Sequence, residues 1–158
     1  MVWNFNADEG KEGLNDYLVI PVGDYRIRFN TIEETKSKTN KDMLKIKFDV
    51  SGYSSKLFYN FVFDDSTLDA RKRTNANLMK IFDSFGIPEG DMNFQNWIGK
   101  VGACRVKHEI YNGNTNARVS YFKLKKDQKN LPEWVEKGIN DTGSQSMSFA
   151  PELDDIQF

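Results

Sequence analysis

Residues 43–50 read MLKIKFDV, in which every second position is apolar: Leu44, Ile46, Phe48 and Val50. Residues 24–30, DYRIRFN, show the same period of two. This alternation is typical of half-buried antiparallel strands, which pack one face on a core and expose the other. Because Lys and Arg occupy most of the intervening positions, the two stretches predict a sheet with one apolar face and one basic face.

The connection between these two strands, residues 33–42, reads EETKSKTNKD. Its polar and turn-forming residues predict a hairpin between the strands. The hairpin would carry a long cationic loop containing Lys36, Lys38 and Lys41.

A third run, residues 57–63, reads LFYNFVF and is apolar at nearly every position. Either both of its faces are covered, or some of its aromatic side chains are exposed for a purpose. The alternation of side chains along a strand does not decide which set faces outward. It could be Phe58 with Val62, or Tyr59 with Phe61. We therefore expect at least one of Phe58 and Tyr59 to be available for stacking.

The period then changes to that of a helix, with apolar residues at i, i+3, i+4 and i+7: Leu78, Ile81, Phe82 and Phe85. Thr74 is a candidate N-cap, and Gly86 followed by Pro88 ends the segment. These signals predict an amphipathic helix of about three turns.

Two further strands, residues 101–110 and 117–124, are joined by turn residues at 111–114 that suit a tight hairpin, and residues 131–137 predict a last helical turn. The order is strand, strand, strand, helix, strand, strand, which is the element order of an OB-fold. The sequence thus predicts an all-β domain with one main helix: a five-stranded OB-fold barrel with the helix between strands three and four. Oligonucleotides cross strands two and three of such a barrel, between the loops joining strands one to two and four to five.

Charge divides the chain into three parts. Of its 158 residues, 22 are basic and 23 are acidic. Residues 141–158 hold four acidic and no basic residues, and residues 1–16 hold four acidic residues and one lysine, which leaves a central part with a net charge of +6. A basic centre suits a polyanion. We expect an N-terminal extension (1–18), an OB-fold domain (19–137) and a disordered acidic tail (138–158).

The remaining chemistry argues against an enzyme. A single cysteine, Cys104, excludes an internal disulfide framework, and the absence of a signal peptide or long apolar run predicts a cytoplasmic protein without membrane association. Cys104 and His108, the only histidine, supply two ligands where zinc needs four, so we expect no metal and no other cofactor. A nuclease using Asp64 and Asp65 is disfavoured, because neighbouring carboxylates on an extended strand point to opposite sides.

Two resemblances to known families sharpen these expectations. The last five residues, DDIQF, resemble the acidic tip of bacterial single-stranded-DNA-binding proteins, which usually reads DDIPF and recruits replication and recombination enzymes; Gln157 departs from it. The body does not resemble that bacterial protein. Its stretches VGDYRIRF, LFYNFVF, FDSFGI and IGKVGACRVKHEIYNGNTNARVSYF are similar to a phage-borne family of small proteins taken to be single-stranded-DNA-binding, over roughly residues 20–125.

These features predict a sequence-independent single-stranded-DNA-binding protein of phage replication or recombination, acting in the host cell cytoplasm. Cations would track phosphates while rings stack on bases; the predicted residues are Arg26, Arg28, Lys36, Lys38, Lys41, Lys45, Lys47, Tyr53, Phe58, Tyr59, Arg105, Lys107, Tyr111 and Tyr121. The acidic tip would recruit replication or recombination proteins through Asp154, Asp155, Ile156 and Phe158. The alternative is an OB-type adaptor that binds proteins without nucleic acid. The sequence leaves open the oligomeric state, although barrels of this class often assemble.

Overall fold

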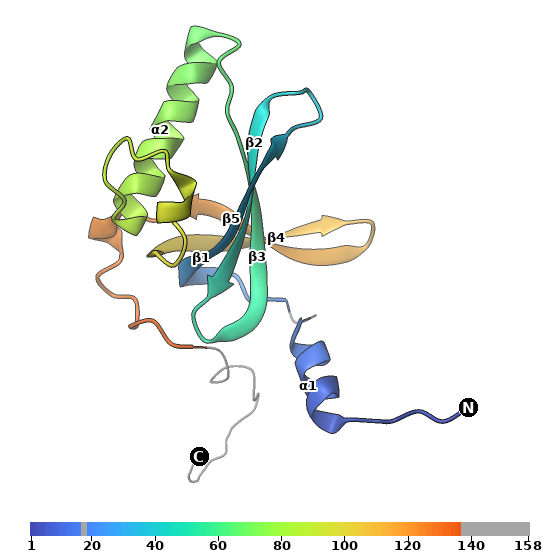
Figure 1. Cartoon of the computed structure of the whole chain (residues 1–158). Coiled ribbons are helices and arrows are strands. Elements are labelled where there is room, and N and C mark those ends of the chain that lie inside the picture. Colours follow the sequence, from blue (N-terminus) through green and yellow to red (C-terminus); the bar gives the residue numbers. More distant parts are fainter. Residues whose placement is uncertain (17–18, 137–158) are drawn as a thin grey trace.

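The computed structural model describes residues 1–16 and 19–136, and five antiparallel strands with one main helix dominate it (Figure 1). The strands are β1 (Gly23–Lys36), β2 (Asp42–Val50), β3 (Tyr53–Val62), β4 (Val101–Tyr111) and β5 (Asn114–Phe122). The helices are α1 (Ala7–Asp16) and α2 (Leu68–Phe85), with short 3-10 turns η1 (Phe94–Asn96) and η2 (Lys125–Asp127). Helix α2 follows β3 and precedes β4 in the chain.

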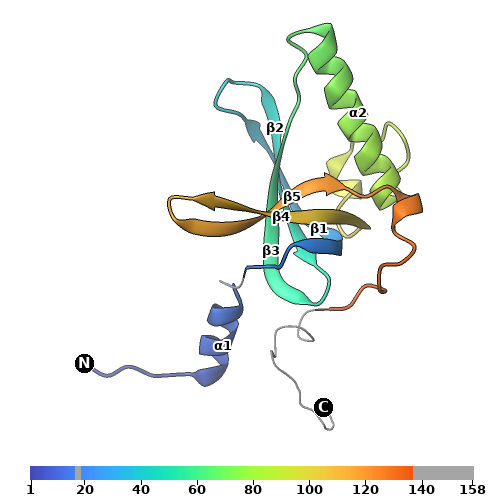
Figure 2. The same cartoon turned by 180° about the vertical axis from the view of Figure 1, so that it is seen from behind.

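The strands form one sheet in the order β3-β2-β1-β4-β5, with long β1 at its centre. An irregularity in the pairing of β1 with β2 lies between Phe29 and Thr31. The two edge strands meet through side chains, because Tyr59 of β3 packs edge-on against Phe122 of β5 with ring centroids 5.1 Å apart. The sheet is therefore strongly curved, as Figures 1 and 2 show from opposite sides.

The apolar positions of the alternating strands face α2, as the period of two predicts. Ile46 and Phe48 of β2 are buried, and Phe29 of β1 packs on Phe85 of α2 with centroids 4.3 Å apart. Trp97 is fully buried beneath the same cluster, and its Nε1 donates a hydrogen bond to a backbone carbonyl. This aromatic cluster is the centre of the core.

Helix α2 lies very close to β4 at Gly102. A Cβ atom added at Gly102 would be 2.7 Å from ring carbons of Phe85, well inside van der Waals contact. One residue earlier on the helix, the buried Ser84 hydroxyl donates to the Ala103 carbonyl and accepts from the Ala103 amide, both at 3.2 Å. Gly102 and Ser84 together fix the separation between helix and sheet.

The start of α2 corrects the sequence prediction. Thr67, and not Thr74, caps the helix, and its hydroxyl accepts a hydrogen bond from the Ala70 amide. Thr74 lies inside the helix, where its hydroxyl bonds the backbone of Asp64. The predicted end is confirmed, because Gly86 adopts the left-handed conformation (φ 66°) that ends helices.

The two hairpins differ in how well they follow the prediction. The β1–β2 loop is only five residues long (37–41), because both strands continue to the pair Lys36 and Asp42, whereas a long loop over 33–42 was expected. The β4–β5 hairpin is the predicted tight turn. Asn112 and Gly113 both have positive φ, 51° and 79°, which suits the two-residue turn that matches strand twist.

Residues 128–136, which we call the strap, run along the end of the sheet without the helical turn expected from residue 131. The Val135 amide donates to the Ser51 hydroxyl, and the Gly52 amide donates to the Val135 carbonyl, each at 2.9 Å. The strap is therefore tied to the β2–β3 turn. The predicted acidic tail, with its tip Asp154, Asp155, Ile156 and Phe158, lies outside the described residues.

Helix α1 was not predicted. The Asn6 side chain caps it by accepting hydrogen bonds from the backbone amides of Asp8 and Glu9. Asn6 followed three residues later by Glu9 is a capping signature that the sequence does contain. Among the two helices of the described ranges, neither has the length and apolar content needed to cross a bilayer.

Candidate nucleic-acid interface

The face of β1, β2 and β3 that points away from the core is the candidate interface. Cross-strand pairing puts Lys47 beside Phe58 and Lys45 beside Asn60, and on the other side puts Thr31 beside Lys47. These side chains line an open hollow of about 380 Å³, which we call the central hollow. Its lining is Thr31, Glu33, Lys45, Ile46, Lys47, Phe58 and Asn60.

The pairing register shows which side chains of β3 face outward. Phe58 points outward and is 58% exposed, and Val62 shares that face. Tyr59 points inward against Phe122, and burial raises the pKa of its phenol. Of the two rings, Phe58 is thus the one available to a ligand.

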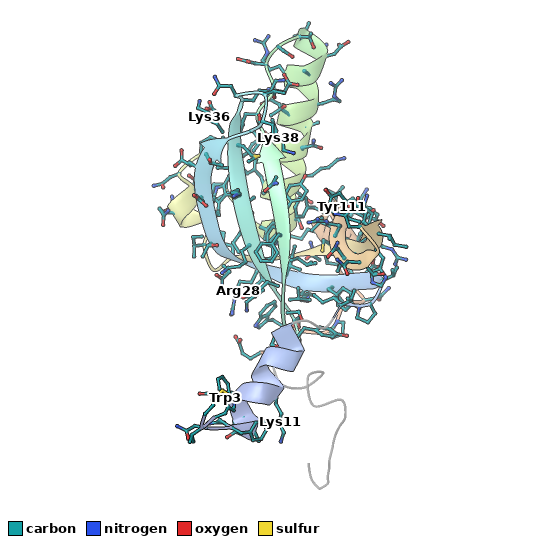
Figure 3. The ribbon with its side chains drawn as sticks, turned by 90° about the vertical axis from the view of Figure 1, so that its right-hand side faces the viewer. Trp3, Lys11, Arg28, Lys36, Lys38 and Tyr111 are labelled. Carbon is teal, nitrogen blue, oxygen red and sulfur yellow. The ribbon has the colours of Figure 1, made fainter. Side chains whose placement is uncertain are left out.

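Two projections border this face. Figure 1 shows the β4–β5 hairpin extending on the side of the sheet opposite to α2. In Figure 3, which looks onto the face, Tyr111 marks the tip of that hairpin at one side, and Lys36 and Lys38 mark the β1–β2 loop above. Tyr111 is 70% exposed. The face therefore has a wall on one side and a basic loop at one end.

Arg28, predicted to bind phosphate, is held by a network at the lower end of the face. Its Nε and Nη2 donate to one Asp49 oxygen at 3.1 and 3.0 Å, and its Nη1 donates to Glu136 of the strap at 2.9 Å. The guanidinium also lies over the Trp134 ring, 4.7 Å from its centroid. Lys56 Nζ is 2.8 Å from the other Asp49 oxygen. We call these five residues the Asp49 network.

Asp49 is a buried carboxylate, yet it is ionised. Burial alone would raise its pKa, but hydrogen bonds and charges from Lys56 and Arg28 outweigh burial and lower the pKa below its usual range. Each Asp49 oxygen is satisfied, since Asn30 also donates to Oδ1 at 3.0 Å. Arg28 therefore helps to neutralise a buried charge, and it could bind a phosphate only by giving up its two hydrogen bonds to Asp49 Oδ2.

The other predicted cations differ in how strongly their partners hold them. Arg26 Nε donates to the Pro132 carbonyl at 2.6 Å, so Arg26 anchors the strap. The remaining ion pairs are exposed or partly exposed: Lys36 with Asp42, Lys41 with Asp64 at 3.9 Å, Arg105 with Asp24 at 3.2 Å and Lys107 with Glu109 at 3.5 Å. Exposed pairs contribute roughly 0 to 1 kcal/mol, so an incoming phosphate can replace the carboxylate in them.

Apart from Arg26, which backbone carbonyls of the strap hold, three predicted cations have no acidic partner within 4.0 Å among residues 1–16 and 19–136: Lys38, Lys45 and Lys47. Lys45 and Lys47 flank the central hollow, and Lys38 lies at the tip of the β1–β2 loop. Their charge is therefore available to a ligand. The structure thus brings unpaired charge and an exposed ring together at one place.

The other predicted aromatic residues are more dispersed. Tyr53 packs edge-on against Tyr25 with centroids 5.7 Å apart, in a hollow that the strap helps to line, and is partly buried. Tyr121 is 51% exposed on β5, opposite Arg105. Tyr121 and Tyr111 belong to the hairpin wall, whereas Tyr53 belongs to the end of the sheet.

The residues considered for catalysis or metal binding lie apart. Burial and the nearby charge of Asp24 raise the pKa of the Cys104 thiol to about 12. His108 Nε2 is 2.8 Å from the Ile20 carbonyl oxygen. Asp64 accepts hydrogen bonds from the amide and hydroxyl of Ser66 and so shapes the turn before α2. In the described part of the chain, no three His, Cys, Asp or Glu residues are grouped to hold a metal ion.

Sequence reasoning missed several residues of this face. Asn60 and Glu33 line the central hollow, and Lys56 completes the Asp49 network. Their membership follows from strand register, which local composition does not give. A weak signal existed, because Asn60 is the polar interruption within an otherwise apolar run.

Comparison with known proteins adds no family assignment. No family model matches the chain, and no curated protein matches its sequence.

Proposed function

We propose that this chain is a single-stranded-DNA-binding protein that binds with little sequence preference and serves phage DNA replication or recombination. The observation that carries the proposal is the central hollow, where exposed Phe58 of β3 lies beside the unpaired Lys45 and Lys47 of the neighbouring strand β2. Ring faces accept any unpaired base, and lysines neutralise phosphates without reading sequence.

We also propose that the sheet is an OB-fold barrel. The strand order β3-β2-β1-β4-β5 supports it, and so does the contact of Tyr59 with Phe122 between the edge strands. In that fold the ligand crosses strands two and three between the two loops that border the face described above. The proposed site and the proposed fold thus agree on the same surface.

The binding path would run from the β1–β2 loop across the central hollow toward the β4–β5 hairpin. Lys38 would meet phosphates at one end and Tyr111 a base at the other, with Phe58 between them. Recruitment of replication or recombination enzymes through Asp154, Asp155, Ile156 and Phe158 remains a proposal based on the resemblance of the tip.

The deciding experiment compares binding of single-stranded and double-stranded DNA of equal length by fluorescence anisotropy. We expect strong preference for the single strand and similar affinity for strands of different composition. Equal binding of both forms would reject the preference for single strands, and no binding of either would favour a protein adaptor. Incubating the oligonucleotide with the protein and magnesium tests the nuclease alternative, and we expect it to stay intact.

A further inference from the structure

Trp134 is the aromatic residue of the strap, and it lies on the outer face of the sheet instead of in the core. It belongs neither to the core cluster nor to the partly buried apolar residues that pack against that cluster. Trp97 shows the contrast, because it is fully buried and packs against three phenylalanine rings. Trp134 is half-buried and packs against no other aromatic ring among residues 1–16 and 19–136. Core packing therefore does not account for Trp134.

Contacts on several sides fix the position of the Trp134 ring. The Arg28 guanidinium lies over the ring, 4.7 Å from its centroid. The ring Nε1 donates a hydrogen bond to Glu136 Oε1 at 3.1 Å. The amide and the carbonyl of the next residue, Val135, are both hydrogen-bonded to the β2–β3 turn. A ring held in this way loses little conformational entropy when a flat ligand stacks on its uncovered surface.

The strand register puts Trp134 one row away from the central hollow. On the outer face, one row consists of Arg28, Asp49 and Lys56, and the next row consists of Thr31, Lys47 and Phe58. The rows are two residues apart along β2 and β3, or about 7 Å, and β1 lies about 10 Å from β3 across β2.

Trp134 lies over the β1 end of the first row, and Phe58 is the β3 end of the second. The two positions are therefore separated by about 12 Å, a distance that a few nucleotides of a single strand can span. Lys47, which has no acidic partner among the described residues, is the β2 member of the second row and lies between them. Two rings with a free cation between them match the alternation of bases and phosphates.

We infer that Trp134 is a second base-stacking residue, and that the nucleic-acid site extends from the central hollow to the lower end of the face. Phe58 and Trp134 stack on two bases of one single strand, and Lys47 neutralises a phosphate between them. Arg28 and Glu136 stay paired and keep the indole in place. The inference rests on the proposed function, since it adds a contact to the same unpaired DNA.

The test uses the fluorescence of Trp134 in the full chain. The chain has three tryptophans, so the variant Trp3→Phe leaves Trp134 and the fully buried Trp97. Titration of this variant with an oligothymidylate of about 12 nucleotides, a length that one such fold can cover, should quench the emission, because a stacked base quenches indole. The variant with both Trp3→Phe and Trp134→Phe should bind the strand with its emission unchanged. Binding of Trp3→Phe without quenching, or quenching that persists in the double variant, would overturn the inference.

Affinity measurements separate base stacking from a role in holding the strap. Trp134→Ala should weaken binding of the oligothymidylate about 5- to 150-fold, as expected for the loss of one stacked base. Trp134→Phe, which keeps a ring, should retain most of the affinity. The matched control is Ser51→Ala, which removes the acceptor of the Val135 amide and leaves both rings in the chain. Equal losses in Trp134→Ala and Ser51→Ala would mean that the ring only anchors the strap, and would overturn the inference.

Failure of this inference differs measurably from failure of the proposed function. Fluorescence anisotropy of a labelled strand reports binding independently of any tryptophan, and Phe58→Ala tests the central hollow alone. A strand that binds through Phe58 without quenching Trp134 would reject the second stacking residue only. A strand that does not bind at all would reject both.

Discussion

Two neighbouring regions of one sheet face use lysine and arginine in opposite ways. In the Asp49 network, Arg28 and Lys56 surround a buried carboxylate, and the strap adds Glu136 and Trp134. In the central hollow, Lys45 and Lys47 have no acidic partner among the described residues and lie beside an exposed ring. A basic residue in the sequence is therefore available to a ligand only if the fold does not pair it with an acidic residue. Paired cations hold the strap and sheet together, and unpaired ones define the proposed binding site.

Removing the Phe58 ring should have the largest effect on ligand binding at the central hollow. Phe58→Ala should weaken binding of single-stranded DNA about 5- to 150-fold, because a stacked base contributes roughly 1 to 3 kcal/mol. Since Phe58 is 58% exposed, thermal stability should change little. Fluorescence anisotropy measures the affinity. Val62→Ala, on the same face of β3, is the matched control, and equal losses in both variants would argue against stacking at Phe58.

Removing the buried charge tests the other region. Asp49→Asn leaves Arg28 and Lys56 without their shared carboxylate and should lower the free energy of unfolding by about 2 to 3 kcal/mol, as expected for lost hydrogen bonds to charged groups. Urea unfolding followed by circular dichroism measures it. Glu33→Gln, which removes an exposed carboxylate from the same face, should leave stability unchanged. A stable Asp49→Asn protein would mean that the network contributes little.

Charge variants distinguish the two sets of cations by salt dependence. Lys45→Gln with Lys47→Gln should reduce the slope of log affinity against log salt by about 1.4, because each neutralised phosphate of a single strand contributes about 0.7. Arg28→Gln should leave the slope nearly unchanged and lower stability instead. If Arg28→Gln changes the slope as much as a lysine does, Arg28 exchanges its carboxylates for phosphate.

Acid should weaken the Asp49 network before it affects the central hollow. The pKa of Asp49 is lower in the folded state than its ordinary value, so its ionised form stabilises the fold above that ordinary value. Its contribution should be lost as the pH falls below about 4, toward the folded-state pKa. Unfolding free energies measured from pH 6 to pH 3 should fall less steeply for Asp49→Asn than for the natural chain. Parallel curves would contradict this.

The smallest effect concerns the acidic tail. Deleting residues 141–158 removes four negative charges and no positive ones. If the tail competes for the central hollow, single-stranded DNA should bind about two- to threefold more tightly at low salt, and the gain should vanish as salt screens the charges. Anisotropy titrations at two salt concentrations measure it, and unchanged or weaker binding would reject competition.

Features encoded by neighbouring residues could be predicted from the sequence. The alternation around Ile46 gives the strand and its buried face, Gly86 gives the end of α2, and Asn112 with Gly113 gives the hairpin turn. Each depends on local backbone preference or on a period of two or 3.6. The start of α2 was missed because Thr67 and Thr74 are equally good caps by type, and only the contact with Asp64 assigns Thr74 another role.

Features that join distant residues could not be predicted. Arg28 pairs with Asp49 across 21 positions and with Glu136 across 108, so no local pattern reveals that its charge is neutralised. The outward direction of Phe58 is likewise set by its pairing with Lys47 on β2. A shift of one residue in that register would have exposed Tyr59 instead. The binding residues of such a sheet are a property of register more than of composition.

The close approach at Gly102 has a consequence for how this protein can be altered. The position has no room for any side chain, because a Cβ there collides with Phe85, whereas Thr31, Glu33 and Asn60 on the opposite surface contribute little to the core. A randomised library at the open positions should yield many folded members with new ligand preferences. A library at position 102 should return glycine, which makes that residue a practical landmark for aligning divergent relatives whose binding surfaces have changed.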